Sequence, residues 1–168
     1  GLDDRWYDAP TESKTAKKEA RLEMGISQDV FVAVLVGRID PKKGQDVLVR
    51  ALLELPEDVH AMLVGDPTQD DPTDYFDRLR ALIKDNNLKN RVHIRPYLKS
   101  PQTAFLAADV AVVCSLQESI GSVTLEAMAS GRPVVGADSG GTAAMLSHGR
   151  GWTFEPGDAA GLAEQLAG

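Results

Sequence analysis

The chain has 168 residues, of which 43% are hydrophobic and 26% charged, a composition typical of one globular domain. Its net charge of −7 comes without a basic stripe, which argues against a general nucleic-acid-binding protein. No run of about 18 apolar residues occurs, so the sequence predicts no transmembrane segment.

Cysteine usage points to a compartment. Cys114 is the single cysteine, so an intramolecular disulfide is excluded. A lone cysteine suits a reducing environment, and we expect a cytoplasmic location. The first residues also lack the charged-then-apolar pattern of a signal peptide.

The first 29 residues are polar and rich in charge. Within them, Thr11 or Ser13 can cap a helix that runs to Met24 and ends at Gly25. The apolar content of this stretch is thin. We therefore expect a linker with one surface helix over residues 1–29, followed by the main domain over residues 30–168.

From residue 30 onward, short apolar runs alternate with amphipathic segments. The runs are too short for buried helices and rich in β-branched residues, which predicts buried strands. These strands are expected at 31–36, 61–64, 92–94, 110–114 and 133–137, with a short one at 152–154. Helices are expected at 47–55, 76–83 after a cap at Thr73 or Asp74, 101–106, 122–130, 142–146 and from 158 onward. This alternation predicts an α/β fold, a Rossmann-like doubly wound parallel sheet with helices on both faces.

In such sheets, ligands bind beyond the carboxyl ends of the strands, so the segments after the strands are the candidate sites. After the first strand, the loop 37–44 places Arg38 at the strand tip and Lys43 at the mouth of the next helix, between Gly37 and Gly44. Arginine offers a planar fork for phosphate oxygens and lysine a mobile charge. Taken alone, an ordinary solvated turn explains this loop equally well.

The segment 118–131 follows the fourth predicted strand and opens a helix. Amides at Ser122, Val123 and Thr124 would point out of the helix N-terminus and form an anion site. Glu126 could accept hydrogen bonds from a ribose diol, and Glu118 could face another part of the ligand. The alternative is a favourable helix-end charge at Glu126 and a solvated carboxylate at Glu118.

The spacing from Glu118 to Glu126, followed by Ala-Met-Ala-Ser-Gly-Arg-Pro-Val-Val, resembles the signature of family-four retaining glycosyltransferases, which have the two-domain GT-B fold. The loops 37–44 and 138–141 match the same family. The resemblance covers the chain from about residue 30. It implies that this chain is the nucleotide-sugar-binding half, with the N-terminal acceptor-binding domain absent.

The resemblance also implies roles for individual residues. Arg38 and Lys43 would hold the diphosphate and stabilise its charge as it leaves. Glu118 would contact the donor sugar near the reacting centre and Glu126 the ribose. The base would lie around Arg95 to Tyr97. Further donor contacts are expected from Gly37, Ser119, Ile120, Gly121, Ser122, Val123 and Thr124. Ile120 stands where phenylalanine is common, and Ala143 and Ala144 replace a frequent proline and glutamate.

The expected ligand is a nucleoside-diphosphate sugar, UDP- or GDP-linked, without a metal or another cofactor. The partner would be the missing acceptor domain, and peripheral membrane contact could occur through that domain. The isolated chain is expected to transfer sugar negligibly. Two alternatives remain: a catalytically silent nucleotide-binding scaffold and a nucleotide-sugar epimerase of the same fold. The three histidines, His60, His93 and His148, lack metal-ligand spacing, and the acidic loop 66–74 reads as a solvated turn.

Overall fold

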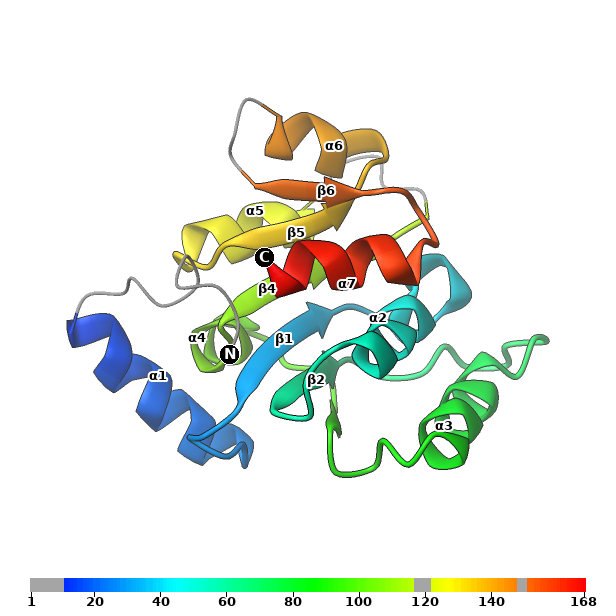
Figure 1. The fold of residues 1–168 in the computed structure, drawn as a ribbon, viewed down its shortest axis with the longest axis horizontal. Helices are drawn as coiled ribbons and strands as arrows, with labels where there is room; N and C mark the ends of the chain where they lie inside the picture. The colour runs from blue at the N-terminus through cyan, green and yellow to red at the C-terminus, as the bar shows by residue number, and fades with distance from the viewer. Residues whose placement is uncertain (1–10, 117–121, 148–150) are drawn as a thin grey trace.

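The structure is a computed structural model in which residues 11–116, 122–147 and 151–168 are described (Figure 1). Its centre is a six-stranded sheet in the order β3-β2-β1-β4-β5-β6, and all its strand pairs are parallel. The strands are β1 (Phe31–Val36), β2 (Val59–Val64), β3 (Val92–Arg95), β4 (Val110–Val113), β5 (Val134–Ala137) and β6 (Trp152–Phe154). The predicted Rossmann-like fold class is confirmed.

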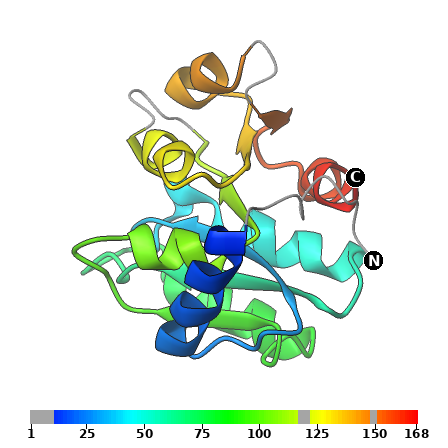
Figure 2. The same ribbon diagram turned by 90° about the vertical axis from the view of Figure 1, so that its left-hand side faces the viewer.

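Helices cover both faces of this sheet. They are α1 (Thr11–Met24), α2 (Gln45–Ala51), α3 (Tyr75–Asp85), α4 (Gln102–Ala107), α5 (Ser122–Ala129), α6 (Gly140–Leu146) and α7 (Ala159–Ala167), with 3-10 turns at Pro41–Lys43 and Leu52–Glu54. One core lies under α2, α3 and α7, and the other under α1, α4, α5 and α6. Figure 2 shows α5 and α7 on opposite sides of β5.

Most element boundaries agree with the sequence-based expectations to within a few residues. The second strand begins at Val59 rather than at residue 61 because Val59 and His60 pair with Phe31 and Val32 of β1. Because His60 is polar, it interrupts the apolar run, and hydrophobicity alone does not indicate that the strand extends to Val59. Pairing with a neighbour, rather than the local apolar run, therefore sets where this strand starts.

Helix α1 is anchored by a buried ion pair that its sparse apolar pattern does not indicate. The Arg21 side chain is only 1% exposed, and its Nη2 donates to Asp109 Oδ2 at 2.8 Å. Its Nε donates to the carbonyl of Ala107, and its Nη1 to that of Val30, both at 2.8 Å. Lys17 also pairs with Asp109. Because a buried charge is tolerated only when it is paired and hydrogen-bonded, these contacts dock α1 firmly against the end of α4.

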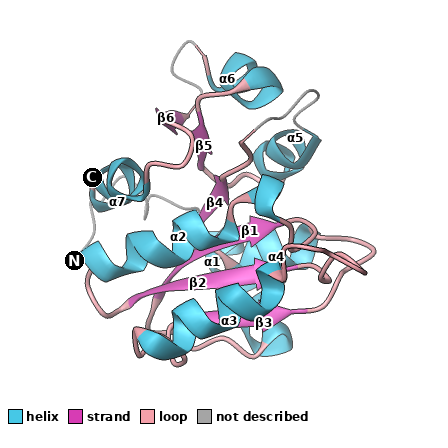
Figure 3. Cartoon of the chain, turned by 90° about the vertical axis from the view of Figure 1, so that its right-hand side faces the viewer, coloured by secondary structure: helices cyan, strands magenta, loops and turns pink. Residues whose placement is uncertain are grey.

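The strand order reverses at β1, which pairs with β2 on one side and β4 on the other. Connections therefore leave β1 and β4 in opposite directions and open a crevice at their carboxyl ends, the usual ligand position in such sheets. Figure 3 shows the arrowheads of β1, β2 and β3 pointing the same way. The N–H of Leu116 donates to the carbonyl of Lys42 at 3.0 Å, which ties the chain beyond β4 to the loop after β1.

Two glycines bring the loops at this edge into backbone contact. A Cβ at Gly65 would lie 2.0 Å from the carbonyl oxygen of Gly37. Gly44 has φ +70°, and a Cβ there would lie 2.5 Å from the carbonyl oxygen of Cys114, which is buried in the core as expected. Any side chain at either position would push the loops apart, so the geometry of this edge requires glycine.

Two histidines that look scattered in the sequence meet between β2 and β3. His60 Nδ1 and His93 Nε2 lie 3.0 Å apart, with ring centroids separated by 5.2 Å. Burial lowers the pKa of both imidazoles, helped by the charge of Arg91 at His60 and by His60 and Arg95 at His93. The pair is therefore held neutral, with one facing nitrogen donating and the other accepting.

A comparison of two glycines tests the backbone contact. Gly44 and Gly131 have nearly the same φ, +70° and +74°, but no atom lies within 4 Å of the Cβ position at Gly131. Substitution by alanine costs about 1–2 kcal/mol at both positions for the left-handed conformation. Gly44→Ala must also displace the Cys114 carbonyl, which should add about 1–3 kcal/mol of destabilisation. Urea unfolding measures both free energies, and equal losses would contradict the contact.

The histidine pair predicts how stability depends on pH. Because the folded-state pKa values lie below the ordinary 6.5, the unfolded chain binds more protons under acidic conditions. The contribution of the pair is thus complete above about pH 6.5 and is lost as the pH falls below that value. The free energy of unfolding should fall more steeply between about pH 7.5 and 5.5 in the parent chain than in the double variant His60→Gln/His93→Gln. Parallel slopes would rule this out.

Candidate functional site

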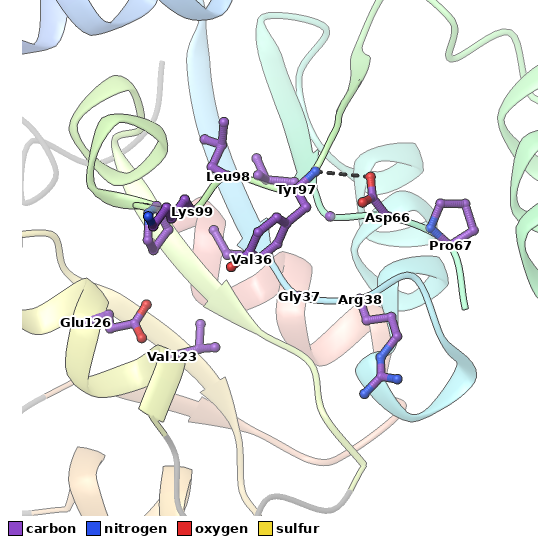
Figure 4. A pocket seen from close by; sticks show the side chains of 13 residues that line it. Val36, Gly37, Arg38, Asp66, Pro67, Tyr97, Leu98, Lys99, Val123 and Glu126 are labelled. Carbon is purple, nitrogen blue, oxygen red and sulfur yellow. Dashed lines mark hydrogen bonds between the residues drawn. The ribbon is translucent and has the colours of Figure 1, made fainter. Parts of the chain in front are cut away.

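A pocket of about 470 Å³ opens at the carboxyl ends of β1 and β2 (Figure 4). The chain that follows β3 forms its second wall, and α5 closes the opposite side. Its lining residues are Val36, Gly37, Arg38, Val64, Gly65, Asp66, Pro67, Tyr97, Leu98, Lys99, Pro101, Val123 and Glu126. The pocket therefore lies at the sheet edge where the topology predicts a ligand.

Five of the residues singled out in the sequence come together in this pocket: Gly37, Arg38, Tyr97, Val123 and Glu126. They come from three separate segments, the loop after β1, the chain after β3 and helix α5. Arg38 and Glu126 line the same cavity rather than opposite edges of the sheet. A cationic group and a carboxylate thus face one space, as an anionic ligand with hydroxyl groups requires.

The backbone around Arg38 is held in place while its guanidinium is exposed. Gln45, which is buried, donates its Nε2 hydrogen to the carbonyl of Arg38 at 2.8 Å. The next residue, Ile39, is also buried, and its N–H donates to the carbonyl of Asp66 at 2.9 Å. An exposed guanidinium on a fixed backbone can meet phosphate oxygens in a bidentate geometry.

Lys43 lies beside the main pocket rather than in its lining. A Cβ at Gly37 would lie 3.5 Å from Lys43 Cδ, so the lysine stem crosses over this glycine. Lys43 lines a small adjoining cavity that shares Val36 and Val123 with the main pocket. Arg38 and Lys43 therefore line two adjoining cavities near the tip of β1.

Helix α5 presents its N-terminal turn and Glu126 to this region. Ser122, the first residue of α5, is exposed, whereas Thr124 is fully buried with its Oγ1 3.4 Å from Thr142 Oγ1. The Thr124 side chain therefore packs against α6, so Thr124 can offer an anion its backbone amide but not its hydroxyl. Four predicted site residues lie outside the described part of the chain: Glu118, Ser119, Ile120 and Gly121.

The two ends of the segment expected to meet the base face different ways. Arg95 donates its Nε hydrogen to the carbonyl of Met24 at 2.8 Å and its Nη2 hydrogen to that of Gly25 at 3.3 Å. Its guanidinium thus fastens the end of α1 and does not line the pocket. Tyr97 does line it, with its side chain 67% exposed and its N–H donating to Asp66 Oδ1 at 3.1 Å.

Several lining residues were not identified from the sequence. Asp66 falls in the acidic loop predicted to be a solvated turn, and the sequence predicts no role for Lys99, although both residues line the pocket. The signal that could have found Asp66 is its position directly after β2, since every strand of a parallel sheet ends at the same edge.

Two features are absent from the described part of the chain. Within 11–116, 122–147 and 151–168, no group of three or more His, Cys, Asp or Glu residues is arranged to hold a metal ion. No helix in the described part of the chain is long and apolar enough to span a membrane.

Comparisons with known proteins identify the family of this chain. The model of the family described as "Glycosyl transferases group 1" matches residues 30–168. The D-inositol 3-phosphate glycosyltransferase of Mycobacteroides abscessus is 41% identical over 134 residues, covering 74% of this chain and 28% of that protein. D-inositol 3-phosphate glycosyltransferase 2 of Catenulispora acidiphila is 36% identical over 158 residues, covering 84% and 36%. The chain thus spans about a third of the length of these relatives.

Solved structures share the fold. HepE of Anabaena, in complex with UDP and glucose, superposes with a TM-score of 0.84 at 32% identity, covering 99% of this chain and 44% of that one. Sucrose-phosphate synthase of Thermosynechococcus elongatus gives a TM-score of 0.79 at 31% identity, covering 89% and 38%. The fold, the pocket at the strand tips and the family match over 139 of 168 residues lead to one assignment: the chain belongs to the group 1 glycosyltransferases.

Proposed function

We propose that this chain binds the nucleoside-diphosphate sugar of a retaining, family-four glycosyltransferase and stabilises the departing diphosphate. The observation that carries this proposal is the meeting of Arg38, Tyr97 and Glu126 around one pocket. Arg38 can donate hydrogen bonds to phosphate, and the Tyr97 ring offers a surface for the base. The Glu126 carboxylate can accept hydrogen bonds from ribose hydroxyls.

The charge pattern supports one orientation of the donor. Phosphate oxygens would lie at Arg38, with Lys43 and the first amides of α5 close by. Glu126 would repel phosphate, so it suits the neutral ribose diol, and the base would extend toward Tyr97. As the bond between sugar and diphosphate breaks, negative charge grows on the leaving oxygen, and preorganised cations stabilise that charge. Glu118 is proposed to contact the donor sugar.

The relatives indicate the kind of donor and acceptor. HepE is described in complexes with UDP and with UDP-glucose, so we propose a uridine diphosphate sugar, with GDP as the alternative base. Acceptor contacts would belong to a separate acceptor-binding domain of the whole protein. An inositol phosphate is the acceptor class suggested by the names of the sequence relatives. The buried lone Cys114 suits the reducing cytoplasm, the proposed location.

A thermal-shift experiment tests the proposal. A ligand that binds only the folded chain raises the melting temperature by mass action, so UDP should raise it and NAD should not. Removing a charge-assisted hydrogen bond should weaken UDP binding about ten- to hundredfold in Arg38→Ala. Arg80→Ala removes an exposed arginine of α3 that pairs with Asp77 and serves as the matched control with parental affinity.

The carboxylate provides a second arm of the same experiment. Glu126→Ala should weaken binding of UDP without weakening binding of inorganic pyrophosphate, because the carboxylate is assigned to the ribose and repels phosphate. A chain that no nucleotide stabilises would contradict the proposal, and stabilisation by NAD alone would point to a dinucleotide enzyme.

A further inference from the structure

Asp66 joins the two walls of the pocket. It follows directly after β2, and its carbonyl accepts the N–H of Ile39, the neighbour of Arg38, at 2.9 Å. Its side-chain Oδ1 accepts the N–H of Tyr97 at 3.1 Å, as Figure 4 shows. One residue thus contacts both the loop that carries Arg38 and the chain that leaves β3.

The two sides of this connection differ in how they are otherwise supported. The loop after β1 is held by the close backbone contact between Gly65 and Gly37 and by the burial of Ile39. Residues 97–101, called the pocket wall from here on, lie between the end of β3 and the start of α4 and belong to no helix or strand. β3 is the edge strand of the sheet, so a neighbouring strand supports the wall from one side only.

We propose that Asp66 is a positioning residue of the nucleotide pocket, which holds the pocket wall at the separation from Arg38 that the nucleoside requires. This inference rests on the proposed function. Tyr97, Leu98, Lys99 and Pro101 of the wall line the pocket, so a shift of the wall changes the room for the base. The phosphate end is set by Arg38 and α5, which the wall does not carry.

The chemistry of a carboxylate argues against direct contact between Asp66 and the diphosphate. Two negative groups at close range repel each other, so Asp66 does not grip the anion. What the wall needs from this side chain is an oxygen that accepts the Tyr97 N–H. Asparagine supplies such an oxygen without the charge, whereas alanine supplies none. The conservative variant therefore separates positioning from charge.

Calorimetric titration of the chain with UDP and with inorganic pyrophosphate tests the inference. Asp66→Ala should weaken UDP binding about three- to tenfold, the range expected for one lost hydrogen bond, and change pyrophosphate binding less than about twofold. Asp66→Asn should keep both affinities within about twofold of the parent. Asp85→Ala, which removes an exposed carboxylate at the end of α3, is the matched control and should change neither.

Folding is checked alongside by urea unfolding, and because the hydrogen bond is exposed we expect Asp66→Ala to fold. The hydrogen bond itself is tested without ligand by exchange of the Tyr97 amide, which should be slowed in the parent and in Asp66→Asn but not in Asp66→Ala. Equal losses in the alanine and asparagine variants, parallel losses for UDP and pyrophosphate, or an unprotected Tyr97 amide in the parent would overturn the inference.

The outcomes separate this inference from the proposed function. A parent chain that binds UDP together with an Asp66→Ala variant of the same affinity removes the positioning role and leaves the function standing. A parent chain that binds no nucleotide overturns both, even if the Tyr97 amide is protected.

Discussion

Backbone contact between the loops at the carboxyl edge of the sheet is the constraint on which the pocket depends. Gly65 lies against the carbonyl of Gly37, and Gly44 against that of Cys114, each with no room for a Cβ. These contacts join the ends of β1, β2 and β4, the strands around the reversal of strand order. Gly37 and Gly44 are the two ends of the loop that carries Arg38 and Lys43, so these contacts hold that loop at both ends.

The same edge explains how a chain with a net charge of −7 can offer a site for an anion. Arg38 and Lys99 line the pocket, Lys43 lies beside it, and the N-terminus of α5 adds partial positive charge. In our interpretation the lining carboxylates do not bind the diphosphate. Asp66 positions the pocket wall, and Glu126 accepts hydrogen bonds from the ribose. Local convergence of a few groups matters more here than the total charge.

Away from the pocket, buried charged side chains stabilise the fold. The Arg21–Asp109 pair is buried beneath α1, where each charge has its partner and further hydrogen bonds. Removing one partner of such a pair leaves an uncompensated buried charge and strongly destabilises the fold. The pair therefore fixes the position of a helix whose apolar face is small. The His60–His93 contact is also buried in part, but its imidazoles are uncharged, and their lowered pKa values make its contribution to stability depend on pH.

The sequence by itself determined the parallel sheet, the segments that end at its carboxyl edge and the types of residue placed there. Apolar runs such as 31–36 and 110–113 and the glycines after them are local patterns, and local patterns can be read along the chain. Tertiary structure decided the rest. The anchoring of α1 by Asp109, the meeting of His60 with His93 and the bond from Tyr97 to Asp66 join residues 31 to 88 positions apart. Such contacts depend on strand register and helix docking, which the long-range packing of the whole chain selects and no short stretch of sequence encodes.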